Sequence, residues 1–405
     1  MRHKVRLAGN VARLVAVALA CWAVSSTARA QSGQSVLYSV TTREARSGAP
    51  IDKTQLSKTE IFAVDPETGK QRLVFSDANV PFLLMPGGGG MPGGIFAAGG
   101  KIFAEGIVPV QTLAHTPYLD TSASAAIYEL STDGSGQARK VLDMGSAGPH
   151  VNFHKLFFNS AGTKFGNIND VAGKWYLFVY ETETGKLLRK SELVAWEFGS
   201  VENIGWMPDD KRIFFTVYVG GDDPEAWWTT PNSPVGTYVL GEADTYERLA
   251  PEASLHPKVA GLQPSNDSPA VFIGTLPNGG YLLWDVQSGP RSDSDTCPHE
   301  PALANNGHVC LYELDLAKKT QRMFPFHADA VPENFHLSAA RDRLVFTSTK
   351  VEYQQQPKFK ATSTLSIWVL DFESNKEWNV ISFPPPDDTR HVGPRVNLIG
   401  WLDSK

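Results

Sequence analysis

The stretches IFAVDPETGKQRLVF (residues 61–75) and LFVYETETGKLLR (residues 177–189) decide the fold of this chain. Each has a short strand of apolar and aromatic residues, a polar turn that ends in Thr-Gly-Lys, and a second strand. Glycine adopts the positive φ that a tight hairpin turn requires, and the acidic and hydroxyl side chains around it favour a solvated turn. Both stretches therefore predict a β-hairpin.

The hairpin recurs along the chain. Looser copies begin at Ile127, Thr237, Leu311 and Ile367, so that six hairpins follow one another at broadly similar spacings. A second unit lies between the hairpins, because NIGWMPDDKRIFFT (203–216) aligns without a gap with NFHLSAARDRLVFT (334–347). Related segments lie at 95–103 and 157–164, and a less regular one spans 271–284. Each complete repeat thus holds four short strands, a to d.

Four-stranded units that repeat at intervals of roughly 40 to 60 residues are typical of a β-propeller. The two chain ends support this interpretation. The first strand (36–40) begins a unit that lacks strand a, and NLIGWLD (397–403) repeats the strand-a motif around Trp206. An open array of β-sandwiches would leave this split unit unexplained. We therefore expect an all-β fold: one domain over residues 31–405, a six-bladed β-propeller with four-stranded antiparallel blades, whose N-terminal blade is completed by the C-terminal strand.

The motif around Trp206 carries a family resemblance. Trp-x-Pro-Asp-Asp-Lys-Arg before an apolar strand, followed by an Asp-containing Thr-Gly-Lys turn, resembles the repeat of TolB-type six-bladed propellers over most of residues 35–405. The resemblance implies a stand-alone propeller, because residues 31–36 leave no room for the α/β domain that precedes the propeller of TolB. The partnership of TolB with the peptidoglycan-associated lipoprotein is therefore not transferred. Similar propellers cap prolyl oligopeptidases, but this sequence has no Gly-x-Ser-x-Gly nucleophile elbow.

Residues 1–30 have the parts of a cleaved secretory signal peptide. Basic residues precede an apolar run over 14–24, and Ala28-Arg29-Ala30 stands before Gln31. We expect cleavage after Ala30 and a periplasmic or secreted protein without a transmembrane segment, since no later apolar run reaches about 20 residues. A lipoprotein anchored at Cys21 is the less favoured alternative, because Ala18-Leu19-Ala20 reverses the usual order of a lipobox.

Composition excludes two classes of protein. The chain is 42% hydrophobic, which is too much for a disordered chain. It carries 37 Lys and Arg against 43 Asp and Glu, so it has no basic excess with which to bind nucleic acid.

Beyond the signal peptide the chain has two cysteines, Cys297 and Cys310. In an oxidising compartment we expect them to form a disulfide bond across a loop rich in Pro, Asn and Gly. The alternative is a zinc site in which Cys297, His299, His308 and Cys310 supply thiolate and imidazole ligands at an unusual spacing.

Histidines gather on one side of the expected propeller. The b–c and d–a connections share one face of the ring and are the longer ones; we call this the long-connection face, and the face of the a–b and c–d turns the short-turn face. His154 and His336 stand near the start of strand a in blades three and six, which oppose each other in a six-bladed ring. These two are candidate metal ligands. Further candidate binding residues around the same funnel are His150, His391 and Arg395. The competing interpretation is that each histidine makes local hydrogen bonds to the backbone.

Trp227 and Trp228 lie in an acidic b–c connection and are candidates for a platform that binds a sugar or a protein, with packing against the blade edge as the alternative. The favoured function is a non-enzymatic exported scaffold that recognises a protein or a cell-envelope or saccharide ligand through the long-connection face, without a cofactor. The alternative is an extracytoplasmic metal-assisted lyase or hydrolase with a divalent metal in a histidine-lined funnel.

Overall fold

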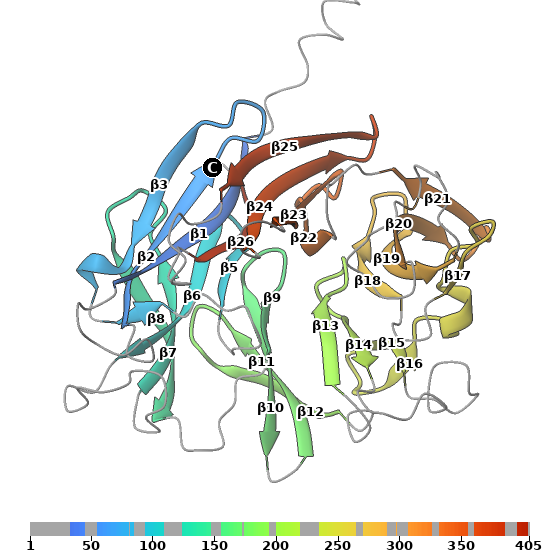
Figure 1. Ribbon diagram of the computed structural model, residues 1–405. Helices are drawn as coiled ribbons and strands as arrows, with labels where there is room; N and C mark the ends of the chain where they lie inside the picture. The colour runs from blue at the N-terminus through green and yellow to red at the C-terminus, as the bar shows by residue number, and fades with distance from the viewer. Residues whose placement is uncertain are drawn as a thin grey trace, which may run out of the picture.

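The fold is a ring of six antiparallel sheets (Figure 1). It is seen in a computed structural model that describes residues 33–44, 55–80, 82–84, 94–108, 124–146, 155–171, 174–193, 200–218, 235–264, 270–289, 297, 307–325, 332–354, 360–384 and 395–403. Each sheet holds strands a to d in spatial order, with strand a nearest the centre. The predicted six-bladed β-propeller is confirmed.

The blades are numbered in chain order, and their strands have the following bounds. Blade one contains β26 (Arg395–Asp403), β1 (Gln34–Glu44), β2 (Gln55–Val64) and β3 (Gln71–Ser76). Blade two contains β5 (Ile95–Ala98), β6 (Lys101–Val108), β7 (Ser124–Leu130) and β8 (Ala138–Ser146). Blade three contains β9 (Lys155–Phe158), β10 (Lys164–Val171), β11 (Lys174–Glu181) and β12 (Leu187–Glu192). Blade four contains β13 (Ser200–Trp206), β14 (Ile213–Tyr218), β15 (Gly236–Leu240) and β16 (Tyr246–Arg248). Blade five contains β18 (Val271–Thr275), β19 (Tyr281–Ser288), β20 (Gly307–Asp315) and β21 (Thr320–Phe324). Blade six contains β22 (Pro332–Leu337), β23 (Arg343–Gln354), β24 (Lys360–Asp371) and β25 (Lys376–Phe383).

The C-terminal strand closes the ring. β26 pairs with β1 in antiparallel register, with Trp401 opposite Val36, so blade one is built from both ends of the described chain. The Gln34 side chain donates a hydrogen bond of 2.8 Å to Asp403. Closure in this way removes two exposed sheet edges. None of the helices in the described ranges is long and apolar enough to cross a membrane.

The hairpin turns have the chemistry that the repeat predicts. In the first hairpin, the Asp65 carboxylate accepts hydrogen bonds from the backbone N–H groups of Glu67 and Thr68 at 2.9 and 3.0 Å. Gly69 follows with φ +69°, and Gly185 has φ +66° at the equivalent place in blade three. These turns are local structures, which explains why the sequence alone identifies them.

Two sheets have a fifth short strand that the sequence does not reveal. β4 (Leu83–Leu84) pairs with β6, and β17 (Gln263–Pro264) pairs with β19, each within a long d–a connection. Conversely, the polar sequence of residues 351–364 favours a b–c connection in blade six, and the structure differs within its described part. β23 continues to Gln354 and β24 starts at Lys360, so residues 351–354 and 360–364 lengthen a hairpin instead.

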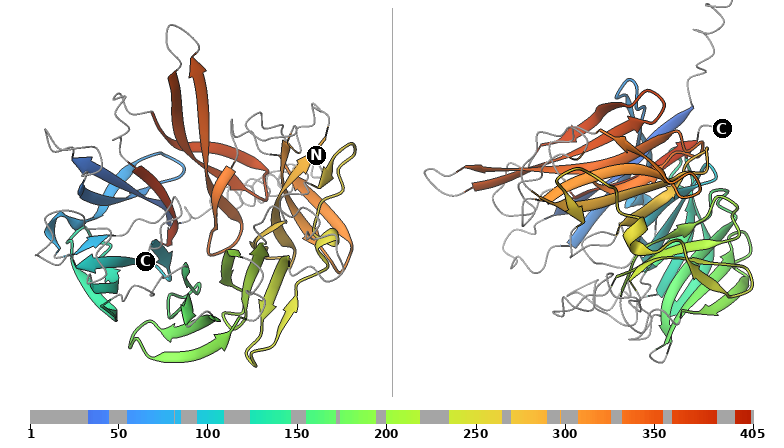
Figure 2. Two further views of the ribbon diagram at one scale, coloured as in Figure 1. Left: turned by 60° about the horizontal axis from the view of Figure 1, so that its bottom comes forward. Right: turned by 90° about the vertical axis from the view of Figure 1, so that its right-hand side faces the viewer.

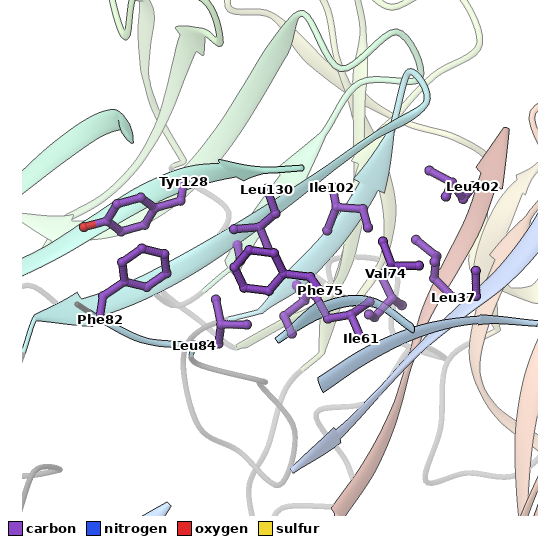
Figure 3. Close-up of a cluster of buried hydrophobic side chains, with 14 of the residues drawn as sticks. Leu37, Ile61, Val74, Phe75, Phe82, Leu84, Ile102, Tyr128, Leu130 and Leu402 are labelled. Carbon is purple, nitrogen blue, oxygen red and sulfur yellow. The ribbon is translucent and has the colours of Figure 1, made fainter. Parts of the chain in front are cut away.

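The core lies between neighbouring blades. Figure 3 shows the cluster between blades one and two, where Ile61 and Phe75 of blade one face Ile102 and Tyr128 of blade two. The segment before β4 adds Phe82, whose ring stacks on Tyr128 with centroids 3.8 Å apart. Full burial of one such side chain contributes about 2 kcal/mol, so the ring is stabilised mainly by these interfaces.

A repeated polar contact also joins the blades. At the second or third position of strand d, a long side chain reaches a backbone carbonyl in the c–d turn of the next blade. The donor–acceptor pairs are Arg72–Thr132 (3.3 Å), Arg139–Glu183 (3.5 Å), Arg189–Gly241 (2.6 Å), Arg322–Phe372 (2.6 Å) and Trp378–Pro66 (2.7 Å). We call these contacts the strand-d clamps. Blade four differs, because Glu247 occupies the register position of the other donors.

Candidate functional site

The centre of the ring contains a cavity of about 440 Å³, which we call the channel cavity. Strand a of every blade contributes to it, including Phe96 of β5, Phe157 of β9 and Trp206 of β13. Residues of the a–b turns, such as Ser160 and Arg341, also line it. Because those turns belong to the short-turn face, the cavity lies at that end of the channel.

His336 is the only histidine among the described residues that line this cavity. Burial lowers the pKa of His336 to about 4, so its imidazole is neutral at neutral pH. Trp401 donates a hydrogen bond of 3.0 Å to the backbone carbonyl of His336, which links blade six to blade one. A Cβ atom on Gly400 would lie 3.3 Å from the Cγ and Nδ1 atoms of the His336 ring. The absence of a side chain at Gly400 therefore leaves the space that the ring occupies. A neutral imidazole in a cavity can accept a hydrogen bond or bind a metal ion.

The sequence placed His336 near the start of strand a, and the structure places it further along. β22 begins at Pro332, so four residues of strand precede His336. Arg395 is the first residue of β26 and is exposed, whereas Gly400, beside His336, lies five residues later in the same strand. At about 3.3 Å per residue, these positions differ by about 16 Å along the channel. The structure therefore does not bring Arg395 and His336 together.

The other candidate residues lie outside the described part of the chain. These are His150, His154, His391, Trp227 and Trp228. The pairing of His154 with His336 across the ring stays a prediction. Within the described ranges, no group of three or more His, Cys, Asp and Glu side chains has an arrangement that could hold a metal ion.

The disulfide bond between Cys297 and Cys310 is present, with Cα atoms 4.5 Å apart. Both residues are fully buried, and His308 lies 3.0 Å through its Nδ1 atom from the carbonyl oxygen of Cys297. Because the two sulfur atoms are bonded to each other, neither is a thiolate, and the alternative zinc site with His299 and His308 is not formed. A disulfide of this kind is typical of an oxidising compartment.

The sequence did not single out a buried charged cluster between blades four and five. Glu252 and His256 come from the connection before β18, and Asp285 comes from β19. The His256 Nδ1 atom lies 3.0 Å from Asp285, and its Nε2 atom lies 3.5 Å from Glu252. Burial disfavours a charge on His256, but the hydrogen bond and the negative charge of Asp285, with Glu252, raise its pKa. Burial raises the pKa of Glu252. We call these three residues the junction cluster.

Comparison with known proteins gives the fold and nothing finer. No family model and no curated protein matches the sequence. Among solved structures, TolB from Acinetobacter baumannii is similar with a TM-score of 0.43 and 14% identity, covering 91% of this chain and 66% of that one. The putative TolB from Agrobacterium tumefaciens is similar with a TM-score of 0.46 and 11% identity, covering 90% of this chain and 98% of that one. The acylaminoacyl peptidase of Pyrococcus horikoshii is similar with a TM-score of 0.42 and 11% identity, covering 85% of this chain and 50% of that one. TolB propellers are thus among the structural neighbours, as the resemblance predicted, but similarity at this level transfers no function to this chain.

Proposed function

We propose that the chain is an exported, non-enzymatic scaffold that binds a protein through its long-connection face. One observation carries the proposal: the two faces of the ring differ in the length of their connections. On the short-turn face, the turns between strands are short: the shortest is the two-residue turn 99–100 and the longest is the seven-residue turn 131–137. On the other face, eight connections are longer than any of these turns, and the five longest span 77–94, 109–123, 219–235, 249–270 and 289–306. Binding residues are concentrated in loops that a rigid scaffold positions, and long loops within a compact domain are usually functional.

Residue types in those connections fit recognition of a ligand. Trp227 and Trp228 belong to the 219–235 connection of blade four, which also contains acidic residues. Tryptophan is enriched among the residues that contribute most to binding energy at protein interfaces. The buried disulfide and the N-terminal signal sequence both support export.

Partner capture from cell-envelope extracts tests the proposal. The protein is exported into a periplasm, and its partners are captured and compared between the wild type and a Trp227→Ala, Trp228→Ala variant. Glu242→Ala is the matched control, because Glu242 is exposed in the c–d turn of the same blade. We expect the tryptophan variant to lose at least tenfold in captured partner and the control to retain it. Equal capture by all three proteins would overturn the proposed role of these tryptophans. Capture of a saccharide rather than a protein would change the ligand class.

Export is tested on the purified protein by intact mass. A chain that begins at Gln31 is expected, whereas an acylated chain that begins at Cys21 would show the lipoprotein alternative.

A metal-assisted lyase or hydrolase is the second candidate, and the neutral imidazole of His336 in the channel cavity favours it. The described lining supplies this one imidazole, and in this candidate His154 would be the second imidazole ligand. Metal content measured without a His-tag or chelator tests this candidate. Near-stoichiometric metal that a His154→Ala, His336→Ala variant loses would support it, and metal-free folded protein would refute it.

A further inference from the structure

The hairpin of blade six is longer than the blade that carries it. β23 and β24 pair with each other over their full length, from Arg343 opposite Asp371 to Gln354 opposite Lys360. β22 accompanies β23 only as far as Ser348, and β25 accompanies β24 only from Leu365. Residues 349–354 and 360–364 therefore form a two-stranded extension, which we call the blade-six ribbon. Figure 2 shows this hairpin extending beyond the ring of blades.

Both outer edges of the ribbon lack a neighbouring strand among the described residues. In an antiparallel pair, every second residue directs its backbone N–H and C=O groups away from the partner strand. Edges of this kind are templates for a further strand, and β-strand addition is a recurrent way to bind an extended peptide. The outer edges, 349–354 and 360–364, are each as long as a usual paired strand.

The charge of the ribbon indicates the chemistry of the added strand. The ribbon residues 349–354 and 360–364 contain Lys350 and Lys360 against one acid, Glu352, whereas the whole chain has a formal net charge of −6. A local positive charge on an acidic protein attracts acidic partners and disfavours pairing with a second copy of the same ribbon. Thr, Val and Tyr in the segment favour the extended conformation.

We propose that the blade-six ribbon binds an extended, acidic segment of a protein partner by strand addition. The proposal rests on the proposed function, because the ribbon prolongs strands b and c of blade six beyond the long-connection face. It adds a specific surface, main-chain hydrogen bonding as the means of recognition, and a partner of defined charge and conformation.

Removal of the ribbon leaves the ring intact, which makes a decisive variant possible. Residues 351–363 are replaced by Asn-Gly, so that Lys350 opposite Thr364 becomes the last pair before a two-residue turn. All pairs of β23 with β22 and of β24 with β25 are retained. The shortened protein should keep its circular dichroism spectrum and its thermal midpoint within a few degrees.

The probe is a displayed library of random octapeptides selected on the mature wild-type protein. We expect enrichment of acidic peptides that lose at least tenfold in affinity for the shortened protein. On binding, alternate backbone amides of 349–354 or 360–364 should become protected from hydrogen exchange. Enriched peptides that bind the shortened protein equally well, or a failure to enrich peptides on the wild type over the shortened protein, would overturn the proposal.

Single proline substitutions give an independent check. Val351 and Glu352 are neighbours in β23, so their N–H groups point to opposite edges of the strand. One of Val351→Pro and Glu352→Pro removes an N–H group that points outward, and the other removes an N–H group directed at β24. The outward variant should weaken peptide binding while the β23–β24 hairpin keeps its hydrogen-exchange protection, whereas the inward variant should reduce that protection as well. Full peptide binding by the variant that keeps the hairpin protected would refute strand addition at β23. If the peptide binding fails while the tryptophan variant still abolishes partner capture, the ribbon proposal fails and the proposed function stands.

Discussion

Glu105 gives the sharpest prediction about stability. It lies in β6 with 6% of its surface exposed, opposite Ile127 of β7. Burial raises the pKa of Glu105 to about 7, from an ordinary value of 4.5. The folded state thus holds this proton more tightly than the unfolded state. The stability that follows is fully present below pH 4.5 and is lost as the pH rises through about 7. At about 1.36 kcal/mol for each pH unit, the loss amounts to about 3 kcal/mol.

Glu105→Gln removes the ionisation and keeps the shape of the side chain. The free energy of unfolding is measured by urea denaturation with tryptophan fluorescence, for both proteins, from pH 4 to pH 8. Other titrating groups cancel in the difference between the two curves. We expect the variant to gain about 3 kcal/mol relative to the wild type over this range. Glu247→Gln, at an exposed position of β16, is the control for the same substitution at the surface. A Glu105→Gln difference that stays constant to within about 1 kcal/mol would refute the reasoning.

Three further predictions concern the contacts between and within blades. Asp285→Asn should lower the free energy of unfolding by about 3–5 kcal/mol, because it removes the nearer of the two buried carboxylates beside His256. It should also reduce the loss of stability seen in the wild type as the pH rises above 6.5, since Asp285 helps to raise the pKa of His256. A double Cys297→Ser, Cys310→Ser variant should lose about 3 kcal/mol, measured by urea denaturation without reductant. Arg322→Ala should cost about 1–2 kcal/mol in thermal unfolding, because it removes the strand-d clamp between blades five and six, and a change below about 0.5 kcal/mol would show that the clamps contribute little.

The sequence predicted the six hairpins because their signal is local. Gly69 and Asp65 fix a turn within a short stretch of chain, and the motif around Trp206 repeats with a constant spacing to the next strand. The split first blade was predictable for the same reason, since strand a has its own motif. β4 and β17 have two residues each and form only because a neighbouring strand is present. The local sequence pattern therefore does not predict them. Residues 351–364 contain a polar run with a proline that is typical of a loop, whereas the pairing of 351–354 with 360–363 is a contact between separate strands that no local pattern encodes.

The candidate sites were less predictable, because they depend on strand ends and on contacts between distant residues. The position of His336 in the channel depends on where β22 begins, and each residue of error in that boundary moves the side chain by about 3.3 Å along the channel. Strand boundaries are the least reliable part of any expectation from sequence. Glu252 and Asp285 are far apart in the sequence and come from different structural units. Only the packing of the 249–264 segment against blade five brings them to one histidine.

The junction between blades four and five suggests why that cluster exists. Here Glu247 replaces the donor of the strand-d clamp, and the long connection after β16 is held instead through Glu252 and His256 against Asp285. A buried charged cluster is a costly way to join two blades, because its groups lose their hydration, but its hydrogen bonds allow one position of the connection. The disulfide at Cys310 anchors the next connection close by, since Cys310 is opposite Asp285 in the β19–β20 pair. Residues 249–264 and Cys297, the described parts of two of the longest connections, are thus held at one point of the scaffold. A binding surface gains affinity when its loops are held before the partner arrives, and this arrangement supports the recognition role proposed for the long-connection face.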